Sequence, residues 1–423
     1  MGLNDQAWER LFEKYRILEE VDRSGRFMIS ASQIKEFREP RLMTKFDHKV
    51  NLPALFRDNR LSILPVTRGD YLISSFSAYQ DFEEHAAAPV KISIPPHLQS
   101  LLPEFLVSEA IALNCALACG VLGDFLEDGD LAPTVSGQMG SGEFAFDINT
   151  AAGTQRVAVS SSQIEIDGAY EGSRYLSLFE AKRDLSDDFL IRQLYYPFRL
   201  WSQRMAKPVK SVFLVFSDGT FHLYQYSFEN PRNYNSLRLV KQKNYVISTK
   251  LSLGDVESLL RTVPPEPEPE LSFPQADRMS RIVNLMELLS GRPMTKQEIT
   301  SRYAFDERQT NYYTDAGRYL GCVEKRTGGG VVFFQLSPRG RRIMALEYRE
   351  RHLAIITQIL KHGIFQEVLR LRLQSGEMPG KGAVVRMMRG AGLRRVEADS
   401  TYLRRSSTVI GWVNWILGCV QEP

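Results

Sequence analysis

One proline- and glutamate-rich stretch, VPPEPEPELSFP (Val263–Pro274), constrains the fold of this chain more than any other feature. Proline lacks a backbone N–H and the intervening glutamates repel one another, so the stretch predicts an extended linker. The chain has 423 residues, a length that corresponds to roughly two to four domains. We therefore expect separate folding units on the two sides of this linker, and a softer boundary near residue 95.

The two sides of the linker differ in charge. From Ser272 to the end of the sequence there are 24 Lys and Arg against 14 Asp and Glu, whereas the remainder holds 29 against 36. A basic part joined to an acidic part is expected when one unit grips nucleic acid and another binds metal. A chance fluctuation of charge is the alternative interpretation.

The composition is typical of a globular protein, with 43% hydrophobic and 24% charged residues. No apolar run reaches the length of about 18 residues that a membrane span needs, and the first residues lack the apolar core of a signal peptide. Cys115, Cys119, Cys322 and Cys419 lack further Cys or His partners at metal-ligand spacing. We expect a cytoplasmic protein with reduced core thiols and no membrane contact.

The middle block, residues 96–262, alternates between helix-like and strand-like runs. An apolar helix is expected over residues 105–126, followed by strands in EFAFDI, SSQIEIDGAYEG and RYLSLFEAKRD. A second helix is expected to begin at Ser186 or Asp187, and a hairpin to turn at residues 217–219. This order predicts an α/β fold, a sheet with helices packed on it.

Two carboxylates and one ammonium converge within these strands. Glu180 and Lys182 share one side of a strand because side chains alternate, and Asp167 comes alongside Glu180 if the two strands pair. Phosphodiester hydrolysis uses such a set. Mg²⁺ is commonly held by one or two carboxylates, and a lysine beside it stabilises developing charge or orients the attacking water.

These residues, IEIDG and FEAK, resemble the motif of the PD-(D/E)XK nucleases, with Ile166 in the position that proline usually occupies. The resemblance implies that Asp167, Glu180 and Lys182 are catalytic and that Asp167 and Glu180 hold Mg²⁺. Gln193 and Tyr196 resemble the Gln-x-x-Tyr helix element of that superfamily, which makes Gln193 a further candidate for the catalytic set. Glu109 is the candidate for an additional metal-binding acid contributed by the preceding helix.

Residues 275–345 have the pattern of a winged helix-turn-helix. Thr295 and Glu298 form a capping box, a second helix is expected to start at Asp306, and a glycine-tipped hairpin follows. In such a module the second helix enters the major groove and the wing holds the backbone. The candidate DNA contacts on this second helix are Arg308, Gln309, Asn311, Tyr312 and Thr314, and those on the wing are Lys325 and Arg326.

A second basic segment follows in residues 346–423. Its arginines are candidates for phosphate contacts, and Trp412 and Trp415 are expected in the core. The four candidate arginines are Arg394, Arg395, Arg404 and Arg405.

Residues 45–418 resemble a group of type II restriction endonucleases, mainly through ILPVTRGDYLISSF, SSQIEIDGAYEG, FEAKRD and TYLRRSSTVIGWVNWI. The resemblance implies sequence-specific cutting of double-stranded DNA, and a companion methyltransferase that acts on the same site. Because both strands must be cut, a homodimer is expected. The expected units are an N-terminal α+β region (1–95), a PD-(D/E)XK core with a mixed sheet (96–262), the linker (263–274), a winged helix-turn-helix (275–345) and a helical basic region (346–423).

Two other functions remain open from the sequence. The same core serves repair and junction-resolving nucleases that recognise DNA structure, although the chain has no P-loop that would indicate a built-in motor. A DNA-binding regulator that retains the Glu180–Lys182 pair without cutting is the other alternative.

Overall fold

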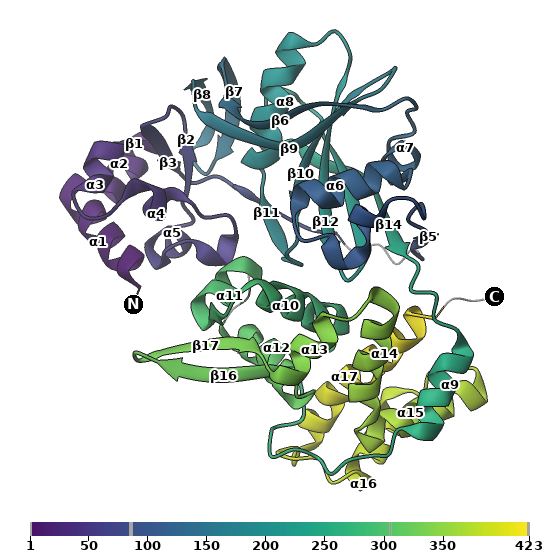
Figure 1. Ribbon diagram of the computed structural model, residues 1–423. Coiled ribbons are helices and arrows are strands. Elements are labelled where there is room, and N and C mark those ends of the chain that lie inside the picture. Colours follow the sequence, from purple (N-terminus) through teal and green to yellow (C-terminus); the bar gives the residue numbers. More distant parts are fainter. Residues whose placement is uncertain (1, 84–87, 304, 306, 421–423) are drawn as a thin grey trace.

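The computed structural model describes residues 2–83, 88–303, 305 and 307–420. The N-terminal region lies beside a central sheet, and the C-terminal helices lie together beyond one end of that sheet (Figure 1). Each part has its own hydrophobic core, and the central sheet has apolar clusters on both faces.

The N-terminal region combines short helices with a three-stranded antiparallel sheet in the order β1-β3-β2. Trp8 and Phe56 are fully buried and pack edge to face at 4.8 Å in its core. Its elements are α1 (Leu3–Tyr15), α2 (Ile17–Ser24), β1 (Arg26–Ser30), α3 (Ala31–Lys35), α4 (Pro40–Thr44), a 3₁₀ turn (Lys49–Asn51), α5 (Ala54–Asp58), β2 (Ser62–Pro65) and β3 (Asp70–Ser74).

The central part is an α/β unit built on a mixed seven-stranded sheet in the order β5-β14-β13-β12-β10-β9-β6. The pairs β10–β12 and β14–β5 are parallel and the other neighbours are antiparallel. The strands are β5 (Val90–Ile92), β6 (Ala132–Gly140), β9 (Gln163–Glu171), β10 (Leu176–Lys182), β12 (Val209–Ser217), β13 (Thr220–Phe228) and β14 (Leu237–Ile247).

Helices cover both faces of this sheet. Helix α8 (Arg192–Arg204) packs on β9, β10 and β12, while α6 (Glu109–Ala118) packs on the opposite face of β9 and β10. The single helix expected over residues 105–126 is wrong, because Gly120 has a φ of 74° and separates α6 from α7 (Val121–Leu126). Left-handed backbone at that position favours glycine and ends the first helix.

Two further expectations differ from the structure. The EFAFDI strand, β7 (Glu143–Thr150), pairs with β8 (Gly153–Ser160) in a separate two-stranded sheet, outside the seven-stranded one. Residues Ser186 and Asp187 do not cap a helix, because β11 (Asp188–Leu190) follows them and pairs with β4 (Tyr79–Asp81) before α8 begins. The hairpin that turns at residues 217–219 is confirmed by the β12–β13 pairing.

The proline-rich linker follows α9 (Leu253–Thr262) and lies without helix or strand along the C-terminal helices. It is not a free spacer. Glu266 pairs with Lys361 at 2.7 Å, Glu268 contacts Tyr319 and His362, and Phe273 is buried at 1% exposure. Its glutamates are therefore partly neutralised by basic and hydrogen-bonding groups of the C-terminal part.

The C-terminal part is α-rich, with one three-stranded sheet in the order β15-β17-β16. The capping box of Thr295 and Glu298 is confirmed, because the Glu298 carboxylate accepts the Thr295 N–H at 2.7 Å. Its elements are α10 (Met279–Gly291), β15 (Met294–Thr295), α11 (Lys296–Tyr303), α12 (Glu307–Tyr319), β16 (Val323–Gly328), β17 (Val331–Leu336), α13 (Pro338–Met344), α14 (Tyr348–Leu360), α15 (Gly363–Ser375), α16 (Lys381–Gly390) and α17 (Asp399–Gly418). Among the described helices, none combines the length and hydrophobicity that crossing a bilayer requires.

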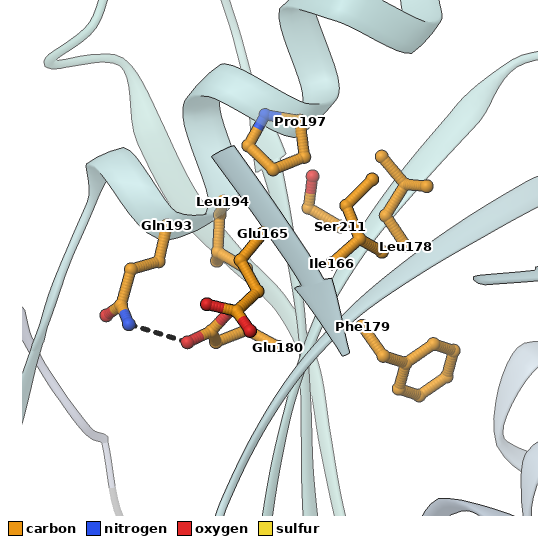
Figure 2. A pocket seen from close by; sticks show the side chains of 9 residues that line it. All are labelled: Glu165, Ile166, Leu178, Phe179, Glu180, Gln193, Leu194, Pro197 and Ser211. Atoms are coloured by element: carbon orange, nitrogen blue, oxygen red, sulfur yellow. Dashed lines mark hydrogen bonds between the residues drawn. The ribbon is translucent and has the colours of Figure 1, made fainter. Parts of the chain in front are cut away.

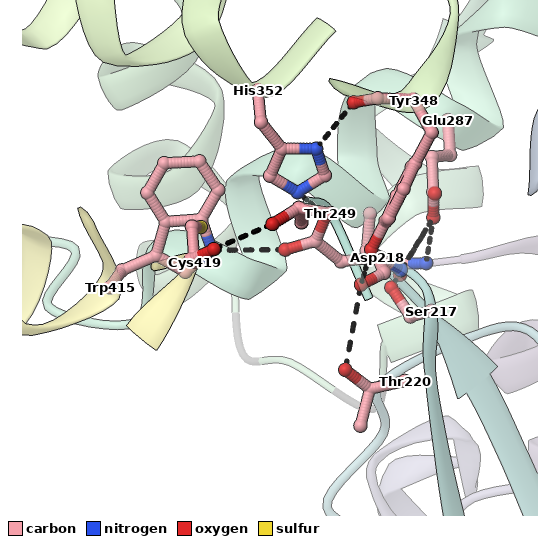
Figure 3. Close-up of polar contacts among 10 residues, drawn as sticks. Ser217, Asp218, Thr220, Thr249, Glu287, Tyr348, His352, Trp415 and Cys419 are labelled. Atoms are coloured by element: carbon pink, nitrogen blue, oxygen red, sulfur yellow. Dashed lines mark hydrogen bonds and ion pairs between the residues drawn. The ribbon is translucent and has the colours of Figure 1, made fainter. Parts of the chain in front are cut away.

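The turn between β12 and β13 inserts into this helical part and joins it to the sheet (Figure 3). Asp218, only 9% exposed, accepts a hydrogen bond from Trp415 Nε1 at 2.9 Å and contacts His352 Nε2 at 3.1 Å. Its carbonyl oxygen accepts the Tyr348 hydroxyl at 3.0 Å, and its N–H donates to Glu287 at 3.4 Å. Because these partners come from α10, α14 and α17, the turn fixes three C-terminal helices against the sheet.

Candidate active site and DNA-facing surface

Strands β9 and β10 bring Asp167 and Glu180 together. Their antiparallel pairing runs from Leu176 opposite Glu171 to Phe179 opposite Gly168, so the next positions in this register are Glu180 and Asp167. The Asp167 carboxylate accepts the Ala181 N–H at 2.7 Å. The two carboxylates therefore lie at the point where the two strands separate.

Glu180 faces α8 and is almost inaccessible, with 6% exposure. One of its oxygens accepts a hydrogen bond from the Gln193 amide at 2.5 Å (Figure 2). The same oxygen also contacts the Lys182 ammonium. Between α8 and the strands remains a cavity of about 10 Å³, roughly the space for one water molecule. Glu180, Lys182 and Gln193 thus form one hydrogen-bonded group.

Burial sets the electrostatics of this group. Burial raises the pKa of Glu180 to about 7, with Lys182 opposing the rise and Asp167 adding to it. Burial also raises the pKa of Asp167, against the opposing charge of Lys182. Burial lowers the pKa of Lys182, but Glu180 and Asp167 outweigh it and the net pKa lies above the ordinary value. Two acids in apolar surroundings share one lysine, an arrangement that an added cation would stabilise.

Glu109 and Tyr196 do not join the hydrogen-bonded group of Glu180, Lys182 and Gln193. Glu109 is in the first turn of α6 and acts on Asp167 only through its charge. Within the part of the chain that the structure describes, no three His, Cys, Asp or Glu residues form a metal-binding group, so Glu109 does not complete one with Asp167 and Glu180. Tyr196 is fully buried, and its hydroxyl donates to the Pro65 carbonyl at 2.8 Å instead of facing the carboxylates.

Sequence reasoning missed the connecting segment, residues 183–188, which follows Lys182 directly. Asp188 is buried at 5% exposure, and its carboxylate contacts His48 Nδ1 at 2.8 Å and accepts the Lys49 N–H at 2.9 Å. Asp184 pairs with Arg302 of α11 at 3.3 Å, and Asp187 pairs with Arg281 of α10. The only signal for this segment in the sequence was its acidic composition, because its partners come from residues far away in the chain.

The residues predicted to read DNA divide into exposed and buried sets. Arg308 and Asn311 are exposed on α12, and the Arg308 guanidinium contacts the Tyr312 hydroxyl. Gln309 is half-buried. Thr314 is wrong as a DNA contact, because it is 1% exposed and its hydroxyl donates to the Thr310 carbonyl at 2.8 Å.

The β16–β17 hairpin projects away from the helices (Figure 1). Lys325 and Arg326 are exposed on β16, and Arg326 pairs with Glu324 at 2.7 Å. At the tip, Gly329 and Gly330 have φ values of 58° and 79°, which glycine adopts without strain. The exposed side chains of Lys325 and Arg326 on this hairpin are therefore accessible to a ligand.

The four arginines near the C-terminal end differ in accessibility. Arg395 and Arg404 are exposed, and Arg394 is exposed while pairing with Glu270 of the linker at 3.1 Å. Arg405 differs from the prediction because it is half-buried and donates to the Phe273 carbonyl, so it holds the linker in place. The expected core position is confirmed for Trp412, which is 0% exposed.

Three comparisons with known proteins complete the description of the site. Residues 5–73, 74–246 and 281–421 match three family models, each described as a domain of unknown function (DUF6996, DUF6997 and DUF7226, respectively). The second match contains Asp167, Glu180 and Lys182, and the third begins within α10. No curated protein and no solved structure matches the chain.

Proposed function

We propose that this protein is a Mg²⁺-dependent endonuclease that cuts double-stranded DNA at specific sequences, with a PD-(D/E)XK core and a C-terminal winged helix-turn-helix. The observation that carries the proposal is the convergence of Asp167, Glu180 and Lys182 where β9 and β10 separate. A buried and a half-buried acid, both with raised pKa values, beside a lysine are a costly arrangement in a structural role. The same arrangement is suited to holding a divalent cation.

The residues present fit Mg²⁺. Asp167 and Glu180 would hold the ion, because one or two carboxylates are a common protein contribution and water and phosphate oxygens fill the other positions. When bound, the ion supplies Lewis-acid polarisation of a phosphodiester oxygen and acidifies water. Gln193 holds Glu180 through one oxygen and leaves the second outside that hydrogen bond.

In this proposal Lys182 acts on the phosphate. In the structure its ammonium pairs with Glu180, and its side chain keeps 30% exposure. With Asp167 and Glu180 holding a cation, the Lys182 ammonium would leave its pairing with Glu180 and face the scissile phosphate. There it would stabilise developing negative charge and orient the attacking water.

DNA recognition is assigned to the C-terminal part. Exposed Arg308 and Asn311 on α12 would face base edges, and Lys325 and Arg326 would contact the sugar–phosphate backbone. The basic charge of this part supports the assignment. Because a duplex has two strands to cut, we propose that two copies act together, and that a companion methyltransferase protects the same sites.

The test is digestion of unmethylated plasmid and phage DNA with Mg²⁺, with EDTA and Lys182→Ala as controls. Lys207→Ala is the matched variant, since it removes another lysine that pairs with a carboxylate of β9, Glu171 at 2.7 Å, away from the site. Discrete fragments from wild type and Lys207→Ala, absent with EDTA and with Lys182→Ala, are expected. DNA that stays intact across methylated and unmethylated substrates would overturn the proposal, and binding without cutting would favour a DNA-binding regulator.

A further inference from the structure

Helix α10 presents three polar side chains along one face. Arg281, Asn284 and Glu287 are spaced three residues apart and therefore lie on neighbouring turns of the same side. Arg281 is 6% and Asn284 0% exposed. Buried polar groups are costly unless they have partners, so the partners of these side chains are informative.

Two of the three side chains bond to the connecting segment. Arg281 pairs with the Asp187 carboxylate, and the Asn284 amide donates to the Arg183 carbonyl at 2.7 Å. Arg183 is the residue immediately after Lys182, so Asn284 fixes the backbone beside the proposed catalytic lysine. Glu287 instead contacts Ser217 and the Asp218 N–H at the β12–β13 turn (Figure 3).

The same two side chains also contact α11 and α12, the helix pair of the proposed winged helix-turn-helix. The Asn284 Oδ1 atom accepts the Tyr303 hydroxyl of α11 at 2.6 Å. The Arg281 guanidinium lies 5.8 Å from the ring centre of Tyr313, on α12. Each side chain therefore bridges this helix pair and the connecting segment through direct contacts. The far end of that segment is held independently, by His48 and Lys49 at Asp188.

We propose that Arg281 and Asn284 are positioning residues that couple DNA binding by α11 and α12 to the placement of Lys182. This inference rests on the proposed function. It predicts that loss of these contacts slows the cutting step without weakening DNA binding, because neither side chain lies on the DNA-facing surface. A displacement of catalytic groups by about 1 Å costs up to about a hundredfold in rate.

The test compares wild type, Asn284→Ala and Tyr303→Phe with Ser406→Ala, which removes a buried side-chain hydrogen bond within α17, to the Leu403 carbonyl, away from the connecting segment. The cutting rate of unmethylated phage DNA is measured with excess enzyme and Mg²⁺, and the Kd for the same DNA is measured in EDTA. Asn284→Ala should slow cutting by about tenfold or more while the Kd changes by less than about twofold. Tyr303→Phe, which removes one hydroxyl and keeps the ring, should show the same direction with a smaller effect.

Equal slowing in Asn284→Ala and Ser406→Ala, or a loss of rate explained entirely by Kd, would overturn the coupling. Hydrogen exchange of residues 183–188 separates this result from failure of the proposed function. If wild type binds DNA without cutting it, the nuclease proposal fails. The coupling still stands if DNA slows exchange of these amides in wild type and not in Asn284→Ala. No change on DNA binding, or no DNA binding at all, would overturn it.

Discussion

Replacing the buried carboxylate Glu180 by glutamine should stabilise the metal-free protein at alkaline pH. Glutamine has nearly the same shape and keeps the oxygen that accepts the Gln193 amide, but it cannot ionise. The ionised form of Glu180 is disfavoured because the side chain is 6% exposed. The variant therefore removes an unfavourable buried charge, but it also removes the ion pair between residue 180 and the Lys182 ammonium.

The size of this effect follows from the pKa of Glu180. That pKa lies at about 7 in the folded protein against an ordinary 4.5, so folding favours the protonated acid. The contribution is fully present below pH 4.5 and is lost as the pH rises through 7. The interval between the two values corresponds to a contribution of about 3 kcal/mol to the free energy of unfolding.

The assay is urea unfolding of wild type and Glu180→Gln in EDTA at pH 5 and pH 8, following the transition that contains the central sheet. The stability difference between the two proteins should shift in favour of Glu180→Gln by up to about 3 kcal/mol between these pH values. Glu171→Gln is the control, since Glu171 also pairs with a lysine but is 29% exposed, and its difference from wild type should change much less. Parallel pH profiles for wild type and Glu180→Gln would refute the reasoning.

Three other changes test separate parts of the structure. Lys182→Met should lower the rate of DNA cutting by about 10²-fold or more, measured with excess enzyme, and leave affinity in EDTA nearly unchanged, whereas a proportional loss of affinity would contradict the catalytic role. Gly219→Ala should loosen the C-terminal helices from the sheet at a cost of about 1–3 kcal/mol in thermal or urea unfolding, because its Cβ would lie 1.8 Å from the Tyr348 hydroxyl at a φ of +66°. An unfolding curve identical to that of wild type would show that this contact does not hold the parts together. Removing both Lys325 and Arg326 should weaken DNA binding for all sequences and reduce the salt dependence of log Kd by about two charges in gel-shift titrations, and an unchanged salt dependence would exclude the hairpin from the interface.

The local part of the candidate site could be predicted from the sequence, because its geometry depends on two strands that follow one another in the chain. Asp167 and Glu180 meet through a hairpin, so alternation and a short connection suffice to place them together. Gln193 was found through a resemblance in the following helix, and it does reach Glu180. The capping box at Thr295 was equally readable, because both of its partners lie within one helical turn.

What the sequence did not reveal depends on contacts between distant segments. The pairing of β11 with β4 competes with helix formation at Asp188, and only the tertiary structure decides between them. His48 lies 140 residues before Asp188 and has no motif around it that indicates this contact. The linker composition predicts an extended, self-repelling segment, but Glu268 accepts the Tyr319 hydroxyl and contacts His362, which holds the segment against the C-terminal helices.

One signal in α10 was available and unused. Arg281, Asn284 and Glu287 recur at three-residue spacing in a helix whose other positions are mostly apolar. Such a pattern indicates a buried polar face directed at another part of the chain, since isolated buried polar groups are rare. The structure shows that this face contacts the central part at the connecting segment and at the Asp218 turn.

The most direct test of the account is to map the ends that the purified protein produces on unmethylated phage DNA with Mg²⁺. One recurring sequence is expected around every cut made by wild type, with no cuts at those positions with Lys182→Ala or with EDTA. Cuts that persist in Lys182→Ala, or wild-type protein that leaves all of the DNA intact, would contradict the assignment of Asp167, Glu180 and Lys182 as a nuclease centre.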